Sequence, residues 1–167
     1  MHTPDALLDL HERCHRNLRD LLAHCATLDA AELNRELPGF GYPTVRLQLH
    51  HAIGAEEYWI GVLNGVVNAD DNNADFPTIA ALESWRVRIF AATEAFLREV
   101  SEAALNTARP HATWGGRTRT LAPAHVAVMS AGSQPTRVRP EALAVLAEIG
   151  IDGGGQRSKN VAEIDPA

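Results

Sequence analysis

The sequence lacks the features that mark membrane, secreted and nucleic-acid-binding proteins. No apolar run reaches the ~18 residues of a membrane-spanning helix, so no transmembrane segment is expected. The net charge of −6 does not supply the basic surface that a general nucleic-acid binder needs. The first residues contain no basic segment followed by an apolar block, so no secretion signal is expected. The two cysteines are therefore expected to be reduced thiols in a cytoplasmic protein.

The composition is that of a single globular domain. The chain has 167 residues, of which 46% are hydrophobic and 22% are charged, which is enough for one sizeable core. It contains no internal repeat and no low-complexity linker. We expect one helical domain over residues 1–150 and a disordered tail over residues 151–167.

The stretch from Gly39 to Gly65 is the strongest helical signal in the chain. Thr44 is placed to cap a helix of about 20 residues that has no internal proline. Apolar residues at steps of three and four define its expected buried face: Val45, Leu49, Ala52, Trp59 and Leu63. This pattern predicts that His50 points to solvent and that His51 points to the interior.

The first helix is expected to begin at Thr3 and Pro4 and to end near Leu28. A four-three alternation predicts one narrow seam: Leu7, His11, Cys14, Leu18, Leu21, Cys25 and Leu28. Both cysteines would then be buried and chemically inert. A histidine in such a seam requires a hydrogen-bond partner or a metal ion.

The remaining elements are shorter or more interrupted. They are a helix over Ala30–Leu37 capped by Asp29, a helix from Thr78 to about Ala104, a hairpin over Ala112–Leu121 turning at Gly115 and Gly116, a helix over Pro123–Met129, and a helix over Glu141–Ile149. The prolines at positions 135 and 140 separate the last two helices, since proline breaks a helix interior at a cost of ~3 kcal/mol.

Three separated motifs carry a resemblance to a known family. They are LQLHHAIGAEEYWIGVLNG in the central helix, DFPTIAALESWR (Asp75–Arg86) and TWGGRTRTLAPAHV (Thr113–Val126). From about Pro4 to Val126 the chain resembles the DinB-like superfamily of small helical metalloproteins. The resemblance implies a mainly α four-helix bundle with a long crossover loop and a small hairpin before the last helix. It also implies that His51 is one of three metal ligands, followed by an acid (Glu56) and a tryptophan (Trp59).

The other two ligands of the family are missing. In DinB-like proteins a His-x-x-x-His pair on the fourth helix supplies them, at about the place of Gln134 to Val138 here. This chain has no histidine after His125, and glutamine and valine do not replace two imidazoles. Divergence, decay or a frameshift would each produce such a C-terminal part.

Other residues offer substitutes. His51, His11 and His125 would complete a three-ligand site if the bundle brings them together. The alternative is that His11 is a hydrogen-bonded seam residue, that His15 and His50 are solvated, and that His125 lines the end of the bundle. Glu56 is either a partner or base beside such a site or an ordinary cap or salt-bridge residue.

Two functions remain open from the sequence. In the first, the chain is a catalytically silent bundle that binds a small molecule or forms a homodimer. In the second, it is a divalent-metal-dependent hydrolase or a thiol-dependent transferase or isomerase, with zinc or nickel held by His51 and substitute ligands. The incomplete ligand set favours the first. Neither a nucleic acid nor a membrane is an expected partner.

Overall fold

The computed structural model describes residues 1–39, 41–67 and 72–128. Residues 1–127 form one compact unit, and a second unit begins at Val128. The predictions for Gln134, Val138, the helix over Glu141–Ile149 and the tail lie outside the described residues. All elements discussed below, apart from the last residue of α6, belong to the first unit.

Three long helices begin at threonine caps that the sequence predicts. They are α1 (Pro4–Cys25), α3 (Val45–Leu63) and α4 (Ile79–Glu99). Their caps are Thr3, Thr44 and Thr78, whose hydroxyls accept from backbone N–H groups in the first turn. Such a bond satisfies one of the amides that a helix start leaves without an intrahelical partner. The three predicted starts are therefore confirmed.

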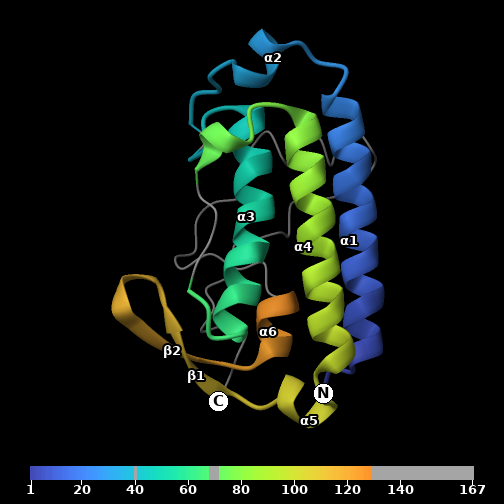
Figure 1. Cartoon of the computed structure of the whole chain (residues 1–167), viewed down its shortest axis with the longest axis vertical. Coiled ribbons are helices and arrows are strands. Elements are labelled where there is room, and N and C mark those ends of the chain that lie inside the picture. Colours follow the sequence, from blue (N-terminus) through green and yellow to red (C-terminus); the bar gives the residue numbers. More distant parts are fainter. Residues whose placement is uncertain (40, 68–71, 129–167) are drawn as a thin grey trace, which may run out of the picture. The chain divides into compact units, whose positions relative to one another are not determined.

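The long helices run side by side, and α4 packs against both α1 and α3 (Figure 1). The short helix α2 (Ala30–Asn34) lies at one end, and the hairpin and α6 (Pro123–Val128) lie at the other. This arrangement confirms the predicted mainly α fold with a small hairpin before the last described helix. No helix in the described part of the chain combines the length and apolar content needed to cross a bilayer.

The helices α2 and α4 end earlier than predicted. α2 keeps the predicted Asp29 cap but ends at Asn34, because the next residue, Arg35, is extended. α4 ends at Glu99 instead of about Ala104. The hydroxyl of Ser101 then caps a separate helix, α5 (Glu102–Leu105), which the sequence pattern had merged with α4.

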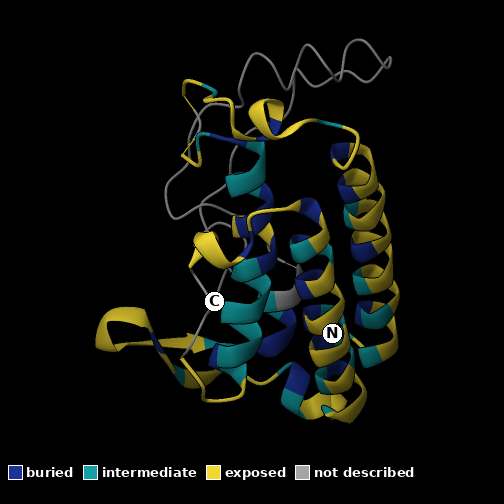
Figure 2. Cartoon of the chain, turned by 45° about the horizontal axis from the view of Figure 1, so that its top comes forward, coloured by how far each residue is buried: buried dark blue, intermediate teal, exposed yellow. Residues whose placement is uncertain are grey.

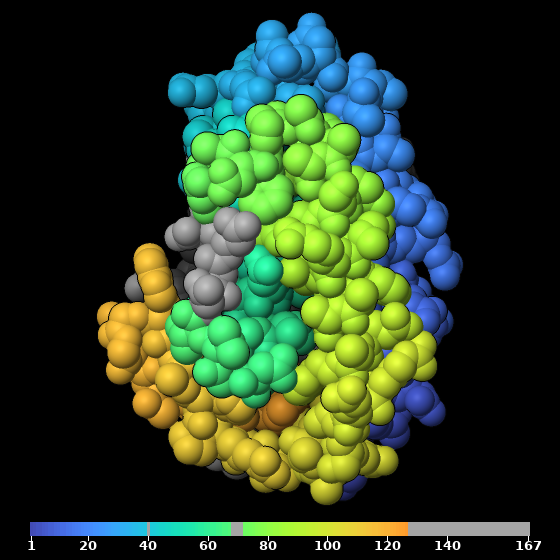
Figure 3. Space-filling view, in the orientation of Figure 1, coloured from blue at the N-terminus to red at the C-terminus, as the bar shows by residue number. Residues whose placement is uncertain are grey.

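The hairpin consists of β1 (Arg109–Thr113) and β2 (Arg117–Leu121), which pair antiparallel. A short 3₁₀ turn, η2 (Trp114–Gly116), joins them, and both of its glycines have φ of +70°. Glycine adopts this left-handed conformation without the penalty that a side chain brings. In the space-filling view the hairpin and α1 lie at opposite edges of the molecule, with α3 and α4 between them (Figure 3).

The core lies where α1, α3 and α4 meet. Trp85 and Leu82 of α4 are fully buried, and Leu22 of α1 and Ile53 of α3 are 1% exposed. Buried residues follow the facing sides of the helices, while the outer sides are exposed (Figure 2). The ring of Trp85 stacks on Phe76 at a centroid distance of 4.1 Å.

The buried stripe of α1 departs from the predicted seam. Its buried residues are Leu7, His15, Leu22 and Cys25. Cys14 and Leu21, which the seam places in the interior, are exposed. A straight α-helix drifts by about 20° per heptad against a four-three repeat, so the neighbouring residues turn inward instead. The helix also ends at Cys25, before the predicted Leu28.

The predicted orientation of the two central histidines is wrong. His50 is 7% exposed, and its ring lies against Trp85 and Phe76 at centroid distances of 5.0 and 5.4 Å. His51 is exposed and stacks on Tyr42 at 4.0 Å. Apolar residues surround most of α3, so its pattern does not single out one inward face. Packing against α4 selects the face.

Candidate functional site

Two histidines of α1 form one wall of the site. His11 and His15 are one helical turn apart, so both side chains leave α1 on the same side. The side chains are 9% and 5% exposed, and the ring centroids lie 4.4 Å apart. Both rings also contact Phe90 of α4, at centroid distances of 4.8 and 5.1 Å. The expectation that His15 is solvated is therefore wrong, because α4 covers it.

Glu56 of α3 is the centre of this polar cluster. Its Oε2 lies 2.7 Å from Nε2 of His15, and its Oε1 accepts a hydrogen bond from the Thr93 hydroxyl at 2.7 Å. Nδ1 of His11 lies 3.7 Å from the same Oε1. Burial alone would raise the pKa of Glu56, but hydrogen bonds from His15 and Thr93, together with electrostatic interactions with His15 and His11, hold that pKa below its ordinary value. Glu56 is therefore a carboxylate anion at neutral pH.

Arg86 of α4 determines which nitrogen of His15 carries hydrogen. Its Nη1 lies 3.2 Å from Nδ1 of His15. A guanidinium has only donors, so Nδ1 must accept, and the ring hydrogen lies on Nε2, which donates to Glu56. Arg86 is also bound by Glu83 through two hydrogen bonds of 2.6 and 2.7 Å, which raise the pKa of the guanidinium.

His11 has a different hydrogen-bonding pattern. Its Nε2 lies 3.3 Å from the carbonyl oxygen of Phe90, which only accepts, so this nitrogen donates. Burial lowers the pKa of His11 despite the opposing charge of Glu56, so the ring is neutral at neutral pH. Nδ1 of His11 is then an acceptor that faces Oε1 of Glu56, itself an acceptor.

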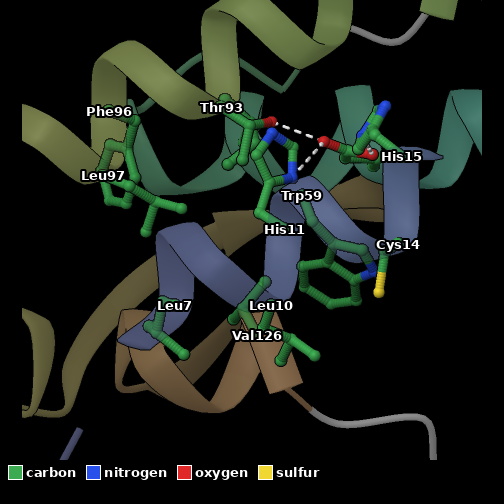
Figure 4. Close-up of a pocket in the computed structure, with 12 residues that line it drawn as sticks. Leu7, Leu10, His11, Cys14, His15, Trp59, Thr93, Phe96, Leu97 and Val126 are labelled. Carbon is green, nitrogen blue, oxygen red and sulfur yellow. Dashed lines mark hydrogen bonds and ion pairs between the residues drawn. The ribbon is translucent and has the colours of Figure 1, made fainter. Parts of the chain in front are cut away.

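A cavity of about 220 Å³ adjoins the cluster. The apolar part of its lining comes from α1, α3, α4 and α6: Leu7, Leu10, Trp59, Ile60, Phe96, Leu97 and Val126. His11, His15, Glu56, Thr93 and Cys14 complete the lining. In the close-up, dashed lines run from Thr93 and His11 to one unlabelled carboxylate oxygen (Figure 4), which is Oε1 of Glu56. The cavity therefore combines a hydrocarbon lining with one anionic group.

Three histidines were proposed as ligands: His51, His11 and His125. Within the described part of the chain, His11 is the one of these that lies in a group of potential metal ligands. Among the described residues, the group of three potential ligands is His11, His15 and Glu56, whose ligand atoms lie within 4.8 Å of one another. His51, the family-matched ligand, stacks on Tyr42 at the surface of α3 instead. His125 is a half-buried residue of α6 and is not part of the group.

The two cysteines occupy different environments. Cys25 is buried, and burial raises the pKa of its thiol, as expected for an inert core cysteine. Cys14 is exposed and contributes to the cavity lining, so the expectation that both cysteines are buried is wrong for this residue.

Sequence reasoning did not assign a role to Arg86 or Thr93. The signal that was available is the spacing of polar residues on α4. Arg86 lies three residues after Glu83, and Thr93 lies seven residues after Arg86. These spacings place the three side chains on one face of a helix. Polar residues on a face that also carries core residues such as Ile89 need partners, and these partners lie on α1 and α3.

A divalent metal ion fits only part of the cluster. Two imidazoles and a carboxylate are a suitable donor set for zinc. His11 fits, because its other nitrogen donates to a carbonyl, as is usual for a ligating histidine. His15 does not fit, because ligation through Nε2 requires the hydrogen to move to Nδ1, where it would face the donors of Arg86. The described residues therefore do not provide the three ligands of the metal site that the resemblance implies.

The family model of the DinB superfamily matches residues 13–131. No curated protein matches the chain. The matched segment includes α3, α4, the hairpin and the described part of α6, and it begins within α1, between the two histidines of the cluster.

Proposed function

The chain belongs to the DinB superfamily, and on this premise we propose that it is a helical bundle that binds a small molecule beside Glu56, without a catalytic metal of its own. The observation that carries the proposal is the cavity of about 220 Å³ with its apolar lining and single carboxylate. An apolar cavity of about 150 Å³ suffices to bind benzene. A molecule of that size with one polar substituent is therefore the expected ligand.

The composition of the lining supports this proposal. Small-molecule sites are mostly apolar, with a few polar groups that orient the ligand. Here the Glu56 carboxylate is held by His15 and Thr93 and still keeps 26% of its side chain exposed. A rigid, accessible carboxylate next to a hydrocarbon surface favours one orientation of a bound molecule.

The second candidate function is a divalent-metal-dependent hydrolase or thiol-dependent transferase or isomerase. It is favoured by the proximity of His11, His15 and Glu56, whose ligand atoms lie within 4.8 Å. It requires Arg86 to leave His15 so that Nε2 can bind zinc or nickel. Purified, tag-free protein that contains one equivalent of metal would favour this candidate over the first.

We also propose that the chain is a cytoplasmic homodimer. Hydrophobic side chains on the outer sides of α1 and α4 support association, since Leu21 is 49% exposed and Val87 is 50% exposed. A second copy that covers them would remove apolar surface from water. The proposal is independent of the ligand, because neither residue is part of the cavity lining.

The small-molecule function is tested by titrating the protein with toluene and recording the indole N–H signals by NMR. Trp59 lines the cavity, whereas Trp114 is 77% exposed on the hairpin, so the Trp59 signal should shift and the Trp114 signal should not. Leu10→Trp fills the cavity and should abolish the shift. Leu21→Trp, an exposed leucine on the same helix outside the lining, should leave it unchanged. If toluene leaves Trp59 unaffected, the proposed function is wrong.

A further inference from the structure

Two hydrogen-bond acceptors in the cavity lining face each other. Nδ1 of His11 lies 3.7 Å from Oε1 of Glu56, which is too long for a hydrogen bond between them. Nε2 of His11 already donates to Phe90, so the neutral ring has no hydrogen to give to the carboxylate. Because the two atoms are 3.7 Å apart, one donor nitrogen can lie at hydrogen-bond distance, about 2.9 Å, from both. The two acceptors therefore form a receptor for an N–H or O–H group.

The charge of the cluster favours a cation as that donor. Among the described residues, Arg86 is the one cation bonded to it, and two hydrogen bonds hold its guanidinium against Glu83. Within the described part of the chain, the second carboxylate, Glu56, receives hydrogen bonds from His15, whose Nδ1 accepts from Arg86, and from the hydroxyl of Thr93. One negative charge is thus left over, and it lies in the cavity lining. An anionic ligand would be repelled here, and a cationic ligand would be attracted.

The remainder of the lining accepts the hydrocarbon part of such a molecule. Seven apolar side chains surround the polar group, and two of them, Trp59 and Phe96, offer aromatic rings. Aromatic faces attract ammonium ions, and apolar side chains favour the removal of hydrocarbon from water. An inorganic cation would use only the polar end of the cavity.

We propose that the ligand is a small apolar amine, bound as its ammonium ion with N–H groups donated to Oε1 of Glu56 and Nδ1 of His11. This inference rests on the proposed function, because it requires the cavity to take up a molecule from solution. It adds the chemical class of that molecule. The volume of about 220 Å³ limits it to roughly the size of benzylamine.

Calorimetric titrations with benzylamine, benzyl alcohol and toluene test the inference. They are carried out at about pH 8, where an alkylamine is protonated and histidine is neutral. A hydrogen bond to a charged group should make benzylamine bind about 10- to 100-fold more tightly than toluene. Glu56→Gln should remove this preference while leaving toluene binding intact, which also shows that the variant is folded. Glu57→Gln is the matched control, because that carboxylate accepts from Trp85 outside the cavity lining.

The outcomes separate the inference from the function on which it rests. If toluene binds and benzylamine binds no more tightly, the amine inference is overturned and the cavity remains a ligand site. Equal binding of benzyl alcohol and benzylamine likewise overturns it, because charge would then play no part. If none of the three binds, the proposed function itself fails. Stoichiometric zinc binding that Glu56→Gln abolishes would overturn both.

Discussion

The guanidinium of Arg86 sets the direction of the hydrogen bonds in the polar cluster. It donates to Nδ1 of His15 and thereby keeps the hydrogen of this ring on Nε2, directed at Glu56. If the group beside Nδ1 of His15 were an acceptor instead of Arg86, Nε2 would be free for a metal ion. His11, His15 and Glu56 would then form a zinc site. The identity of one residue on α4 thus separates the two candidate functions.

Arg86→Gln should convert the cluster into a metal site. The glutamine carbonyl accepts from Nδ1 of His15, so Nε2 becomes available beside His11 and Glu56. We expect the purified variant to bind about one equivalent of zinc and to melt at a higher temperature when zinc is added, because a ligand of the folded state stabilises it. The original chain and Arg88→Gln, an exposed position on the same helix, should show no zinc-dependent change. An equal response of the original chain would show that Arg86 does not block the site.

The pKa of His11 predicts how stability depends on pH. Burial lowers this pKa from the ordinary value of 6.5 in the folded protein. As pH falls below 6.5, the unfolded chain binds a proton that the folded chain does not, so stability is complete above this pH and decreases below it. Urea unfolding at a series of pH values should show this decrease, and His11→Gln should reduce it. His24→Gln, an exposed histidine of α1, should leave it unchanged.

Glu56 adds a second decrease at lower pH. Burial opposes the shift, but hydrogen bonds from His15 and Thr93 and electrostatic interactions with His15 and His11 hold its pKa below the ordinary 4.5 in the folded protein. The contribution of Glu56 to the free energy of unfolding is therefore fully present above pH 4.5. It is lost as the pH falls through the pKa of Glu56 in the folded protein. Glu56→Gln should make the free energy of unfolding less dependent on pH below pH 4.5. The decrease below pH 6.5, which His11 causes, should remain. A profile identical to that of the original chain would contradict the hydrogen-bonded carboxylate.

At the scale of single elements, local signals predicted where the helices begin but not which face they bury. Each long helix is capped by the threonine directly before it: Thr3, Thr44 and Thr78. A segment of three or four consecutive residues is therefore enough to predict where each helix begins. The inward face of α3 depends instead on packing against α4, and for this reason His50 and His51 are exchanged relative to the prediction. On α1, the drift of a straight helix brings His15 inward.

Removing the cap of α3 should destabilise the whole domain. Thr44 is 6% exposed, and its hydroxyl accepts from the backbone N–H of Leu47 at 3.1 Å. Thr44→Ala should lower the free energy of unfolding by about 1 kcal/mol, measured by urea unfolding. Thr44→Ser keeps the acceptor and should recover most of the loss. If both variants lose the same stability, packing of the threonine methyl group is responsible and not the cap.

At the scale of the whole molecule, the candidate site combines residues that are far apart in the sequence. Glu56 lies 41 residues from His15 and 37 residues from Thr93, and Arg86 lies 71 residues from His15. The four-residue spacing of His11 and His15 puts both side chains on one side of α1, although His15 was expected to be solvated. The packing of the three helices determines which residues of α3 and α4 face the two histidines. The local sequence pattern does not predict that packing.

Association is a property of the whole molecule and is measured by sedimentation equilibrium. We expect about twice the mass of one chain at micromolar concentration, because exposed apolar residues on α1 and α4 are covered by a second copy. Leu21→Glu combined with Val87→Glu should shift the equilibrium to the monomer without loss of helical content. A single-chain mass for the original protein would contradict the homodimer and leave the ligand proposal unaffected.

The central claim is that the cavity beside Glu56 takes a small molecule and that the histidine–glutamate cluster holds no metal ion. A crystal structure determined under xenon pressure tests both parts in one electron-density map, because xenon binds in apolar cavities. The predicted result is a xenon atom beside Trp59 and Phe96, with His15 bonded to Glu56 and Arg86. A metal ion bound by His11, His15 and Glu56, or a cavity filled by neighbouring side chains, would contradict the claim.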